Sequence, residues 1–543
     1  MIRYLPSLLS AALLAGCESS REGSSRASPV AKSFAVDERK AEAFRFLNQA
    51  TCGATETAAA EVIEAGYEAW IDDQLTRPAS LQLPYLEALP RPDRVNTLHA
   101  DRIDVWFRNA LHGEDQLRQR VAFALSQLFV VSEFGALSPM PYAAASYYDL
   151  LAEHAFGNFR DLLEAVTLHP AMAAYLSTLG NRKADRDTHT SPDENYAREL
   201  LQLFTIGLDE LEPDGTPRLD ENGEPIPTYD QEVVEGFARV FTGWHYKGLA
   251  DFLNPSRTLE RQTSPLELYP DFHDTEPKRL LNGVILPGGQ GGEQDLADAL
   301  DNIFDHPNVG PFVSKFLIQR LVTSNPSPDY VARVASTFND NGFGVRGDLS
   351  AVIKAILLDE EARSSKHAGK LKEPLLKLTQ LWRAYNARPV SDGYGTGART
   401  YFKRRIGQGP LQAPSVFNFF SPIYSPPGEL AATGFVAPEF QITTEYQSAT
   451  FTSLLYRQCF NGNSAPQSAR STPVIIDIDE EIELAGDVPA LVERAANKLL
   501  GSRISPPLGS AAMELAGSVD DPAARAAEVI FIIAISPEFA VQA

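Results

Sequence analysis

The chain has 543 residues, of which 44% are hydrophobic and 22% are charged, so a large folded core is expected and low-complexity disorder is excluded. It carries 71 acidic and 48 basic residues, a formal net charge of −23 at pH 7, which favours solubility. Because phosphate groups repel such a chain, nucleic acid and anionic lipid headgroups are disfavoured as main partners.

The first residues have the pattern of a bacterial lipoprotein signal peptide. Arg3 precedes an apolar run over residues 5–15 that is too short to span a bilayer, and the sequence LAGC that ends at Cys17 resembles a lipobox. We therefore expect removal of residues 1–17 and a lipid anchor at Cys17; a plain secretory signal peptide is the alternative. Glu18 follows where Asp would favour inner-membrane retention, so we expect a periplasmic protein anchored in the outer membrane.

The segment that follows is expected to be a flexible tether. Residues 18–36 are rich in Ser and Arg and have no apolar periodicity. Apart from Cys17, the chain contains only Cys52 and Cys459. An oxidising periplasm would permit a disulfide between them, and two separate buried thiols are the alternative, because no spacing brings them together.

From Asp37 onward the hydrophobic pattern is mainly helical. Apolar residues recur at three- and four-residue spacing over 38–50, 56–75, 115–132 and 147–177. Strand signals are confined to three short stretches, at 209–229, 280–287 and 473–479. The fold class that follows is mainly α, a large multi-helix assembly with an internal helical repeat and a small β-hairpin insertion.

Two regions are expected after the tether. The N-terminal helical region covers residues 37–295, with the hairpin insertion at 209–229, and the C-terminal helical region covers residues 296–543.

The C-terminal region contains the repeat. VSKFLIQRLVTSNPSP, from Val313, resembles VERAANKLLGSRISPP, from Val492, and two further helical segments follow each in the same order. This predicts a duplicated unit at about 312–363 and 491–540. Chance similarity between amphipathic helices is the alternative.

The stretch SPDENYARELLQLFTIGL, from Ser191, predicts an amphipathic helix with an unusually polar face. Ser191 at the N-cap, Pro192 at the first helical position and Glu194 two residues later would form a capping box, which explains Glu194 without any functional role.

The same face also supplies candidate catalytic residues. Asn195 and Glu199 are four residues apart, and Arg198 lies beside them, so these side chains can interact along the helix. If the loops around His169 and His273 cover this face, Glu199 is desolvated and can act as a general base, with Asp230 contributed by a neighbouring helix start. A solvated stripe of an ordinary amphipathic helix is the alternative.

A divalent metal is the one cofactor considered, and the cofactor otherwise stays unknown. His169, His273 and Asp274 are suitable ligand types, but no HExxH motif or close His pair is present, so distant segments would have to assemble the site. Structural roles are the alternative, with His169 capping a helix and His273-Asp274 forming a turn.

Several motifs occur together in a recognisable order. They are HPAMAAYL from His169, ENYARELLQLFTIG from Glu194, FTGW from Phe241, the His273-Asp274…Lys278 pattern, and SPEFAVQ from Ser536. From about residue 40 to its end the chain resembles the bacterial family called domain of unknown function 1800. Two departures are APSVFNFFSP at 413–422, where many members have a PPNVKGW-like segment, and Cys52, where an aromatic residue is common.

The resemblance implies secretion and a shared helical fold, but no established activity. Members are often encoded beside the secreted family called domain of unknown function 1501, which resembles sulfatases and alkaline phosphatases, and this implies a working partner. Two functions are therefore considered. The first is an accessory or binding protein of the cell envelope that works with a secreted partner; the alternative is a periplasmic hydrolase with a Glu/His/Asp cleft, with or without a metal. Whether the chain is an enzyme stays open.

Overall fold

The computed structural model describes residues 35–90, 95–187, 189–364, 369–389, 400–460 and 474–542. Residues Phe34–Ala543 form one compact unit. The predicted signal peptide, Cys17 and nearly all of the predicted tether lie outside the described residues. Among the helices of the described part, none is both long and apolar enough to cross a membrane.

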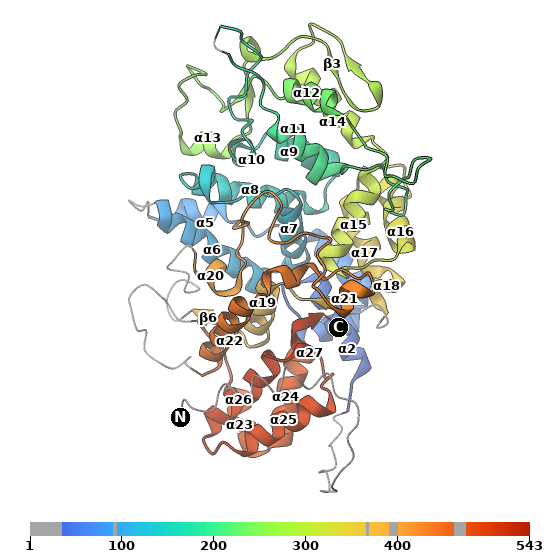
Figure 1. The fold of residues 1–543 in the computed structure, drawn as a ribbon. Coiled ribbons are helices and arrows are strands. Elements are labelled where there is room, and N and C mark those ends of the chain that lie inside the picture. The colour runs from blue at the N-terminus through green and yellow to red at the C-terminus, as the bar shows by residue number, and fades with distance from the viewer. Residues whose placement is uncertain are drawn as a thin grey trace. The chain divides into compact units, whose positions relative to one another are not determined.

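The fold is mainly α, as predicted, and Figure 1 shows helices throughout the described chain. The helices of the N-terminal half are α2 (Glu38–Ala50), α3 (Glu56–Ala65), α4 (Tyr67–Thr76), α5 (Leu83–Ala88), α6 (Val95–His112), α7 (Gln116–Leu128), α8 (Pro141–Glu153), α9 (Phe159–Thr167), α10 (Pro170–Tyr175), α11 (Asn195–Glu199), α12 (Gln231–Val240), α13 (Leu259–Thr263) and α14 (Gly292–Phe304). Short turns of helix lie between them at η1 (Gly135–Leu137), η2 (His154–Phe156), η3 (Leu200–Thr205), η4 (Pro270–Phe272) and η5 (Leu281–Gly283).

Strands form only two-residue antiparallel pairs in the described part of the chain. These pairs are β1 (Trp244–His245) with β2 (Glu267–Leu268), β3 (Lys278–Arg279) with β4 (Ile285–Leu286), β5 (Lys370–Leu371) with β8 (Val541–Gln542), and β6 (Arg388–Pro389) with β7 (Val474–Ile475).

Helix α7 is the buried centre of the N-terminal half. Every residue of it except Arg118 is buried, so it is covered on all sides, as expected of a helix inside a large core. It packs against α4, α6, α8 and α15. Its buried polar residues therefore need hydrogen-bond partners within the protein.

Residues 209–227 form a small meander of short antiparallel runs. Isolated bridges join Asp209 to Pro227, Leu211 to Pro217, and Leu219 to Pro225. Gly215 and Gly223 turn the chain with positive φ angles of 76° and 84°, which glycine adopts without a steric penalty.

The C-terminal half contains two successive sets of four helices. The first set is α15 (Val309–Leu321), α16 (Pro328–Asn339), α17 (Leu349–Leu358) and α18 (Glu360–Arg363), and the second is α24 (Val488–Leu500), α25 (Pro506–Gly517), α26 (Pro522–Ala534) and α27 (Pro537–Ala540). Helices α15 and α24 both have 13 residues, and α16 and α25 both have 12. Strands β5 and β8, which follow the two sets, pair with each other.

A matching hydrogen-bond pattern supports the proposal that these sets are duplicates. Ser327 caps α16, and its backbone N–H and hydroxyl donate to the carboxylate of Glu361. Ser505 caps α25, and its backbone N–H and hydroxyl donate to Glu538 in the same way. In both sets the carboxylate comes from the short fourth helix.

Between the two sets lies a loop-rich region. Its helical pieces are α19 (Pro374–Ala384), α20 (Tyr401–Ile406), α21 (Glu429–Ala432), η7 (Pro438–Ile442) and α22 (Glu445–Phe460), followed by α23 (Asp479–Glu483) and η8 (Leu484–Gly486). Helix α20 packs on α22, and α19 packs on α6 and α24.

Candidate functional site

The polar helix predicted from Ser191 is shorter and less regular than expected. It consists of α11, only five residues long, followed directly by the π-helix η3 over Leu200–Thr205. A π-helix is rare and occurs frequently at functional sites, because its wider turn changes which side chains share a face. Glu199 is the last residue before this change.

The predicted capping box is wrong. Residues 191–194 are not helical, and the N-cap position is Glu194, whose side chain makes no capping bond. The carboxylate of Asp193 instead accepts the backbone N–H of Asn195 at 2.9 Å. Asn181 holds Asp193 in this position, since its side-chain oxygen accepts the Asp193 N–H at 2.9 Å. Ser191 therefore has no capping role.

Glu199 is the predicted catalytic residue that stands out. Its side chain is buried at 8% exposure, and its Oε2 atom has no hydrogen-bond partner. Burial raises the pKa of this carboxyl, and the charge of Arg198 only partly opposes the rise. Arg198 is engaged elsewhere, because its Nη2 atom donates to Glu194 at 2.8 Å and to Gln231 at 3.1 Å. Asn195 lies exposed at the start of the helix.

The charge of Glu199 affects the pKa of two tyrosines. Burial raises the pKa of Tyr175 and of Tyr229 to about 12, and the Glu199 carboxylate adds to both shifts. The Tyr229 hydroxyl is buried without a hydrogen-bond partner. A carboxylate oxygen and a phenol are thus both left unpartnered in one neighbourhood, and such groups can transfer protons.

Asp230, the fourth predicted catalytic residue, has a structural role in this structure. One carboxylate oxygen accepts the Val233 N–H at 3.1 Å and caps α12, and the other pairs with Arg279 at 3.0 Å. The Val233 N–H and Arg279 together lower the pKa of the Asp230 carboxyl. Its position at the start of a helix was predicted correctly, but its carboxylate is exposed and already engaged.

His169 also caps a helix. Its Nδ1 atom accepts the Ala171 N–H at 3.1 Å at the start of α10, and its Nε2 atom lies 3.2 Å from the Ser146 hydroxyl. Burial lowers the pKa of His169 to about 3, so the ring is neutral, and the proton sits on Nε2 because Nδ1 accepts. Neither nitrogen has a free lone pair for a metal in this arrangement.

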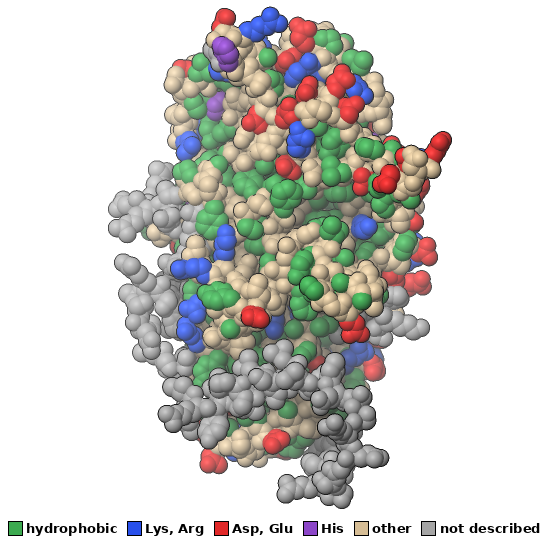
Figure 2. Space-filling model, viewed as in Figure 1, with side chains coloured by type: hydrophobic (Ala, Val, Ile, Leu, Met, Phe, Trp, Pro, Cys, Tyr) green, Lys and Arg blue, Asp and Glu red, His purple; other side chains and the backbone are tan. Residues whose placement is uncertain are grey.

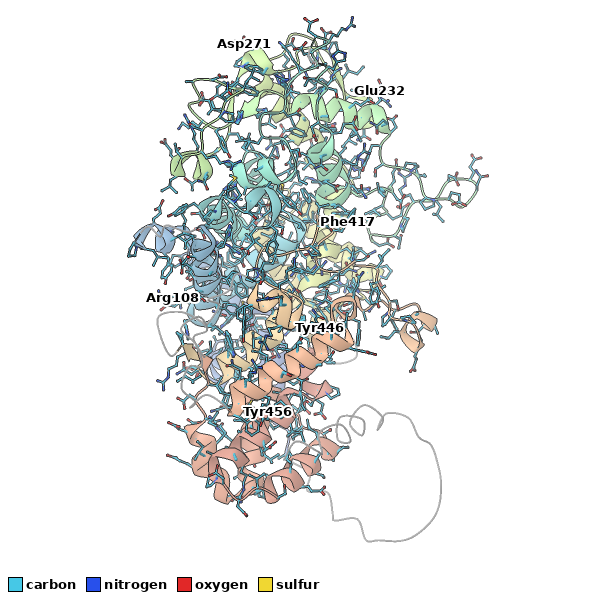
Figure 3. All side chains as sticks on the ribbon, turned by 60° about the vertical axis from the view of Figure 1, so that its left-hand side comes forward. Arg108, Glu232, Asp271, Phe417, Tyr446 and Tyr456 are labelled. Carbon is cyan, nitrogen blue, oxygen red and sulfur yellow. The ribbon has the colours of Figure 1, made fainter. Side chains whose placement is uncertain are left out.

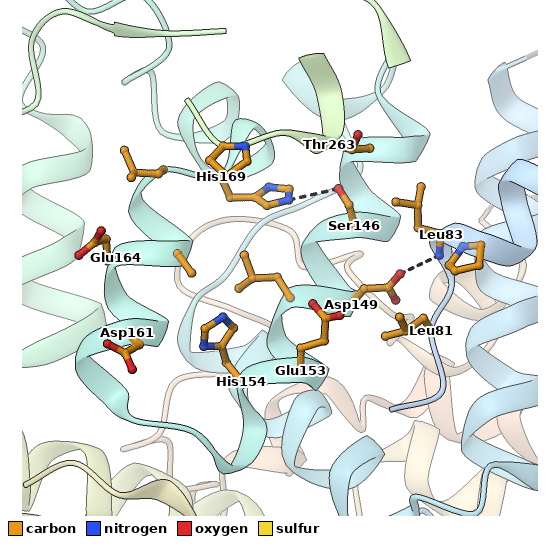
Figure 4. Close-up of a pocket in the computed structure, with 15 residues that line it drawn as sticks. Leu81, Leu83, Ser146, Asp149, Glu153, His154, Asp161, Glu164, His169 and Thr263 are labelled. Atoms are coloured by element: carbon orange, nitrogen blue, oxygen red, sulfur yellow. Dashed lines mark hydrogen bonds between the residues drawn. The ribbon is translucent and has the colours of Figure 1, made fainter. Parts of the chain in front are cut away.

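His169 lines a cavity of about 560 Å³. Figure 4 shows Glu153 and His154 on the wall away from His169, and Asp149 between them and Leu83. Burial raises the pKa of Asp149 to about 7, although two backbone N–H groups oppose the rise. These groups, from Gln82 and Leu83, each lie 2.7 Å from a different Asp149 oxygen, so this carboxylate anchors the start of α5.

His273 belongs to a separate buried cluster. Its Nδ1 atom lies 2.9 Å from the Thr242 carbonyl oxygen, and its Nε2 atom lies 2.9 Å from Asp295 Oδ2. Lys278 Nζ lies 2.6 Å from the same oxygen. The neighbouring Asp274 carboxylate accepts the Glu276 N–H at 2.9 Å and so forms a turn.

The predicted metal ligands therefore have different partners. His169 contacts Ser146, whereas His273 contacts Asp295. Within the described ranges, no group of three or more His, Cys, Asp or Glu side chains is placed to hold a metal ion. Cys52 and Cys459 are both buried and free, and burial raises the pKa of both thiols.

The sequence reasoning missed a buried polar network beneath residues 407–424. Glu133 is fully buried, and Arg102 donates to its Oε2 atom at 2.5 Å. Gln412 donates to the Oε1 atom of Glu133 at 2.8 Å, and Arg102 also donates to the Pro410 carbonyl at 2.8 Å. Charge pairing inside the core thus holds one end of this loop.

A second part of the network holds the other end. Gln127 and Gln408 both donate to Glu373, and Asn418 donates to Gln127 at 3.1 Å. The guanidinium of Arg320 lies 4.6 Å from the ring of Phe420.

Two non-glycine residues of this loop, Leu411 and Asn418, have positive φ angles, and Leu411 is the one that is more strained, because Asn tolerates this region better. Leu411 has a φ of 53°, a region that costs a side chain with a Cβ roughly 1–2 kcal/mol. The Leu411 carbonyl accepts the Glu133 N–H at 2.8 Å, which helps to hold this conformation. Strain of this kind persists only where the surrounding structure enforces it, and it is concentrated at functional sites.

Residues 417–446, from this loop to the first turn of α22, expose several nonpolar side chains, which we name the apolar face. Their exposed fractions range from 36% to 79%, and Figure 2 shows hydrophobic side chains where Figure 1 places α21 and the preceding loop. The apolar face consists of Phe417, Ile423, Leu430, Phe435, Phe440 and Tyr446. The aromatic run FNFFSPIY was the available sequence signal, but sequence alone does not show which rings are exposed.

Comparison with known proteins gives one assignment. The family model described as "Protein of unknown function (DUF1800)" matches residues 45–541. No curated protein and no solved structure matches the chain. Because the matched residues cover nearly the whole sequence, the chain belongs to this family of proteins of unknown function.

Proposed function

We propose that this chain is an accessory protein of the cell envelope, anchored through lipid on Cys17, that binds a secreted partner protein through the apolar face. The apolar face is the observation that carries the proposal. Six of the exposed large hydrophobic residues lie within positions 417–446, and exposed nonpolar surface of this kind frequently marks protein–protein contact sites. Aromatic residues are also enriched at interfaces.

The support beneath the face favours binding over accidental exposure. Phe417 is exposed, yet the next residue, Asn418, is buried and bonded to Gln127 of the central helix α7. The segment that carries Phe435 is tied to the first helical set, because Asn325 exchanges two 2.8 Å hydrogen bonds with Val436. A pre-organised face loses less conformational entropy on binding than a mobile one.

The anchoring part of the proposal has its own test. Cells that express the full chain should incorporate radiolabelled palmitate into it, and the Cys17→Ala variant should not. Label in both proteins, or in neither, would contradict lipid attachment at Cys17.

The binding part is tested with the partner that the family resemblance implies, a secreted protein of the domain of unknown function 1501 family from the same genome. The mature chain carrying Cys17→Ser is immobilised, and partner binding is measured by biolayer interferometry. The double variant Phe417→Ser/Phe435→Ser should bind at least about tenfold more weakly, since central aromatic residues each contribute on the order of 2 kcal/mol.

Phe343 supplies the matched control. It is 90% exposed, on the loop between α16 and α17, and does not belong to the apolar face. Phe343→Ser should leave the affinity unchanged. Equal weakening by Phe343→Ser, or wild-type affinity in the double variant, would contradict binding through this face.

The alternative function is hydrolysis, and Glu199 is the observation that favours it. Its unpartnered Oε2 atom and its raised pKa suit a general base, and Tyr229, whose pKa the Glu199 charge helps to raise, has an unpartnered hydroxyl. We test it by screening the purified mature chain against chromogenic ester, phosphate, sulfate and glycoside substrates. Any activity should fall by at least about a hundredfold in Glu199→Gln, and activity that persists in this variant would exclude Glu199 as the base.

A further inference from the structure

A small basic pocket adjoins the apolar face. It has a volume of about 340 Å³ and is lined by Tyr401, Arg404, Arg405, Tyr446 and Thr450. Tyr446 belongs to both the pocket and the apolar face, so the two surfaces are continuous. Among the residues that the structure describes, no acidic one lines the pocket.

The two arginines of the pocket are not engaged in ion pairs with the described residues. Arg239 and Arg494, for comparison, both face carboxylates. Neither Arg404 nor Arg405 has a carboxylate within 4 Å in the described ranges, although the chain has 71 acidic residues to 48 basic ones. Figure 2 shows Lys and Arg side chains gathered in the area where Figure 1 places α20.

The surroundings fix the orientation of the pocket. The guanidinium of Arg405 lies 5.4 Å from the ring centre of Tyr401, a cation–π contact that limits its rotation. Thr450 donates to the Arg405 carbonyl at 2.6 Å and ties α20 to α22. Lys403 of the same helix points elsewhere, over the ring of Phe134.

A structural explanation of these charges is weak. Basic residues in the last turn of a helix are favoured by the helix dipole, but α20 has only six residues and therefore a small dipole. Nor does the helix dipole explain why the two arginines line a cavity with tyrosine walls. Planar guanidinium groups are suited to bidentate contacts with carboxylates, and tyrosines beside them add hydrogen bonds and nonpolar surface.

We propose that this pocket binds a carboxylate side chain of the partner protein, next to the apolar face, and so fixes the orientation of docking. This inference rests on the proposed function. On a chain with a net charge of −23, an acidic group is repelled from most of the surface. A pocket whose two arginines pair with no carboxylate of the described residues is therefore a selective place for it. The partner is thus expected to present Asp or Glu beside nonpolar residues.

The first experiment needs no partner. The mature chain carrying Cys17→Ser is titrated by calorimetry with an end-capped seven-residue peptide of alternating Glu and Phe, and with the same peptide carrying Gln in place of Glu. The Glu peptide should bind at least about tenfold more tightly at 50 mM salt, and the difference should shrink at 300 mM because salt screens exposed charges. The variant Arg404→Gln/Arg405→Gln should bind both peptides equally.

The matched control is Arg108→Gln/Arg457→Gln, which removes two positive charges outside the pocket. Arg108 lies over the Tyr85 ring, and Figure 3 shows it well apart from Tyr446. If this control removes the preference as fully as the pocket variant does, the effect is one of net charge and the proposal is overturned. Circular dichroism and thermal melts should show that both double variants fold like the wild type.

Partner binding separates this inference from the proposed function. If the partner binds the wild type and Arg404→Gln/Arg405→Gln weakens it more than the Arg108→Gln/Arg457→Gln control does, the pocket has the proposed role. If the partner binds both variants equally, the inference fails while binding through the apolar face stands. Tight binding of inorganic phosphate without any preference for the Glu peptide would identify a site for a free anion and overturn the inference.

Discussion

Glu133 and Glu199 are both buried glutamates, but their surroundings shift their pKa values in opposite directions. Burial alone would raise the pKa of Glu133, but Arg102 and His99 outweigh it and hold the pKa at about 2. Burial raises the pKa of Glu199, and Arg198, which pairs with Glu194, only partly opposes the rise. One carboxylate is fully neutralised by its surroundings, and the other is left with a free oxygen.

The difference separates a structural charge from a candidate functional one. Glu133 holds the strained loop that carries Phe417 and Ile423 of the apolar face, so its removal should be costly. Glu199 holds nothing that the structure shows, and an unpartnered buried carboxylate destabilises the fold that contains it.

The largest effect is expected from Arg102→Met. It leaves Glu133 buried without its main counter-charge, and breaking a buried pair in this way costs about 3–5 kcal/mol. The urea midpoint of Arg102→Met should be lower than that of the wild type, and hydrogen exchange should be faster at the amides of residues 407–424.

The control for this prediction is the double variant Arg102→Met/Glu133→Leu. Because it removes both charges, it should be more stable than the single variant. A single variant that loses less than about 1 kcal/mol would show that the pair is unimportant for the fold.

The stability that Glu133 contributes should be lost at low pH. A folded-state pKa of about 2 against an ordinary 4.5 means that the contribution of Glu133 to stability is complete above pH 4.5 and is lost as the pH falls toward 2. A shift of this size corresponds to roughly 3 kcal/mol. The stability difference between the wild type and Arg102→Met should therefore narrow over this range. A difference that stays constant from pH 6 to pH 2.5 would contradict the assignment.

The contrast also shows what sequence can and cannot predict here. Helices were predictable because their apolar spacing is local, and α2 begins where Asp37 accepts the Lys40 N–H, as the pattern indicated. The capping box at Ser191 failed because Asn181, a residue outside the motif, holds Asp193 in a non-helical conformation. A local motif does not contain that information.

The polar network was beyond sequence reasoning for the same reason. Glu133 meets Arg102 across 31 positions of sequence and meets Gln412 across 279. Glu199 could be identified as a candidate from the polar face of its own helix. Its burial was expected only if loops covered that face, and its neighbours Tyr175 and Tyr229 come from other segments. The apolar face was hidden because exposed and buried aromatic residues alternate within a few positions, as in Phe417 and Phe420.

A smaller effect of opposite sign is expected from Glu199→Gln. A raised folded-state pKa means that the charged carboxylate lowers stability, increasingly as the pH rises through the ordinary and then the folded pKa. Replacing it with a neutral amide should leave the stability at pH 7 unchanged or raise it by up to about 1 kcal/mol, and should give no gain at pH 3. A loss of 2–3 kcal/mol in chemical denaturation at pH 7 would show that Glu199 has a structural partner after all, and the general-base hypothesis would lose its support.

The smallest effect on stability is expected from Phe417→Ser. Its ring is 62% exposed, and surface substitutions away from packed features usually change stability by less than about 0.5 kcal/mol. Phe420, three residues away, gives the opposite expectation, because its ring is 2% exposed and covers the guanidinium of Arg320. Phe420→Ser should cost about 3–5 kcal/mol, as expected for a buried aromatic side chain. Thermal melts and partner binding of the two variants therefore separate the roles of the two residues. Phe420→Ser should lower stability, and Phe417→Ser should weaken binding without a loss of stability. A reversal of either result would show that the apolar face is part of the core rather than a binding surface.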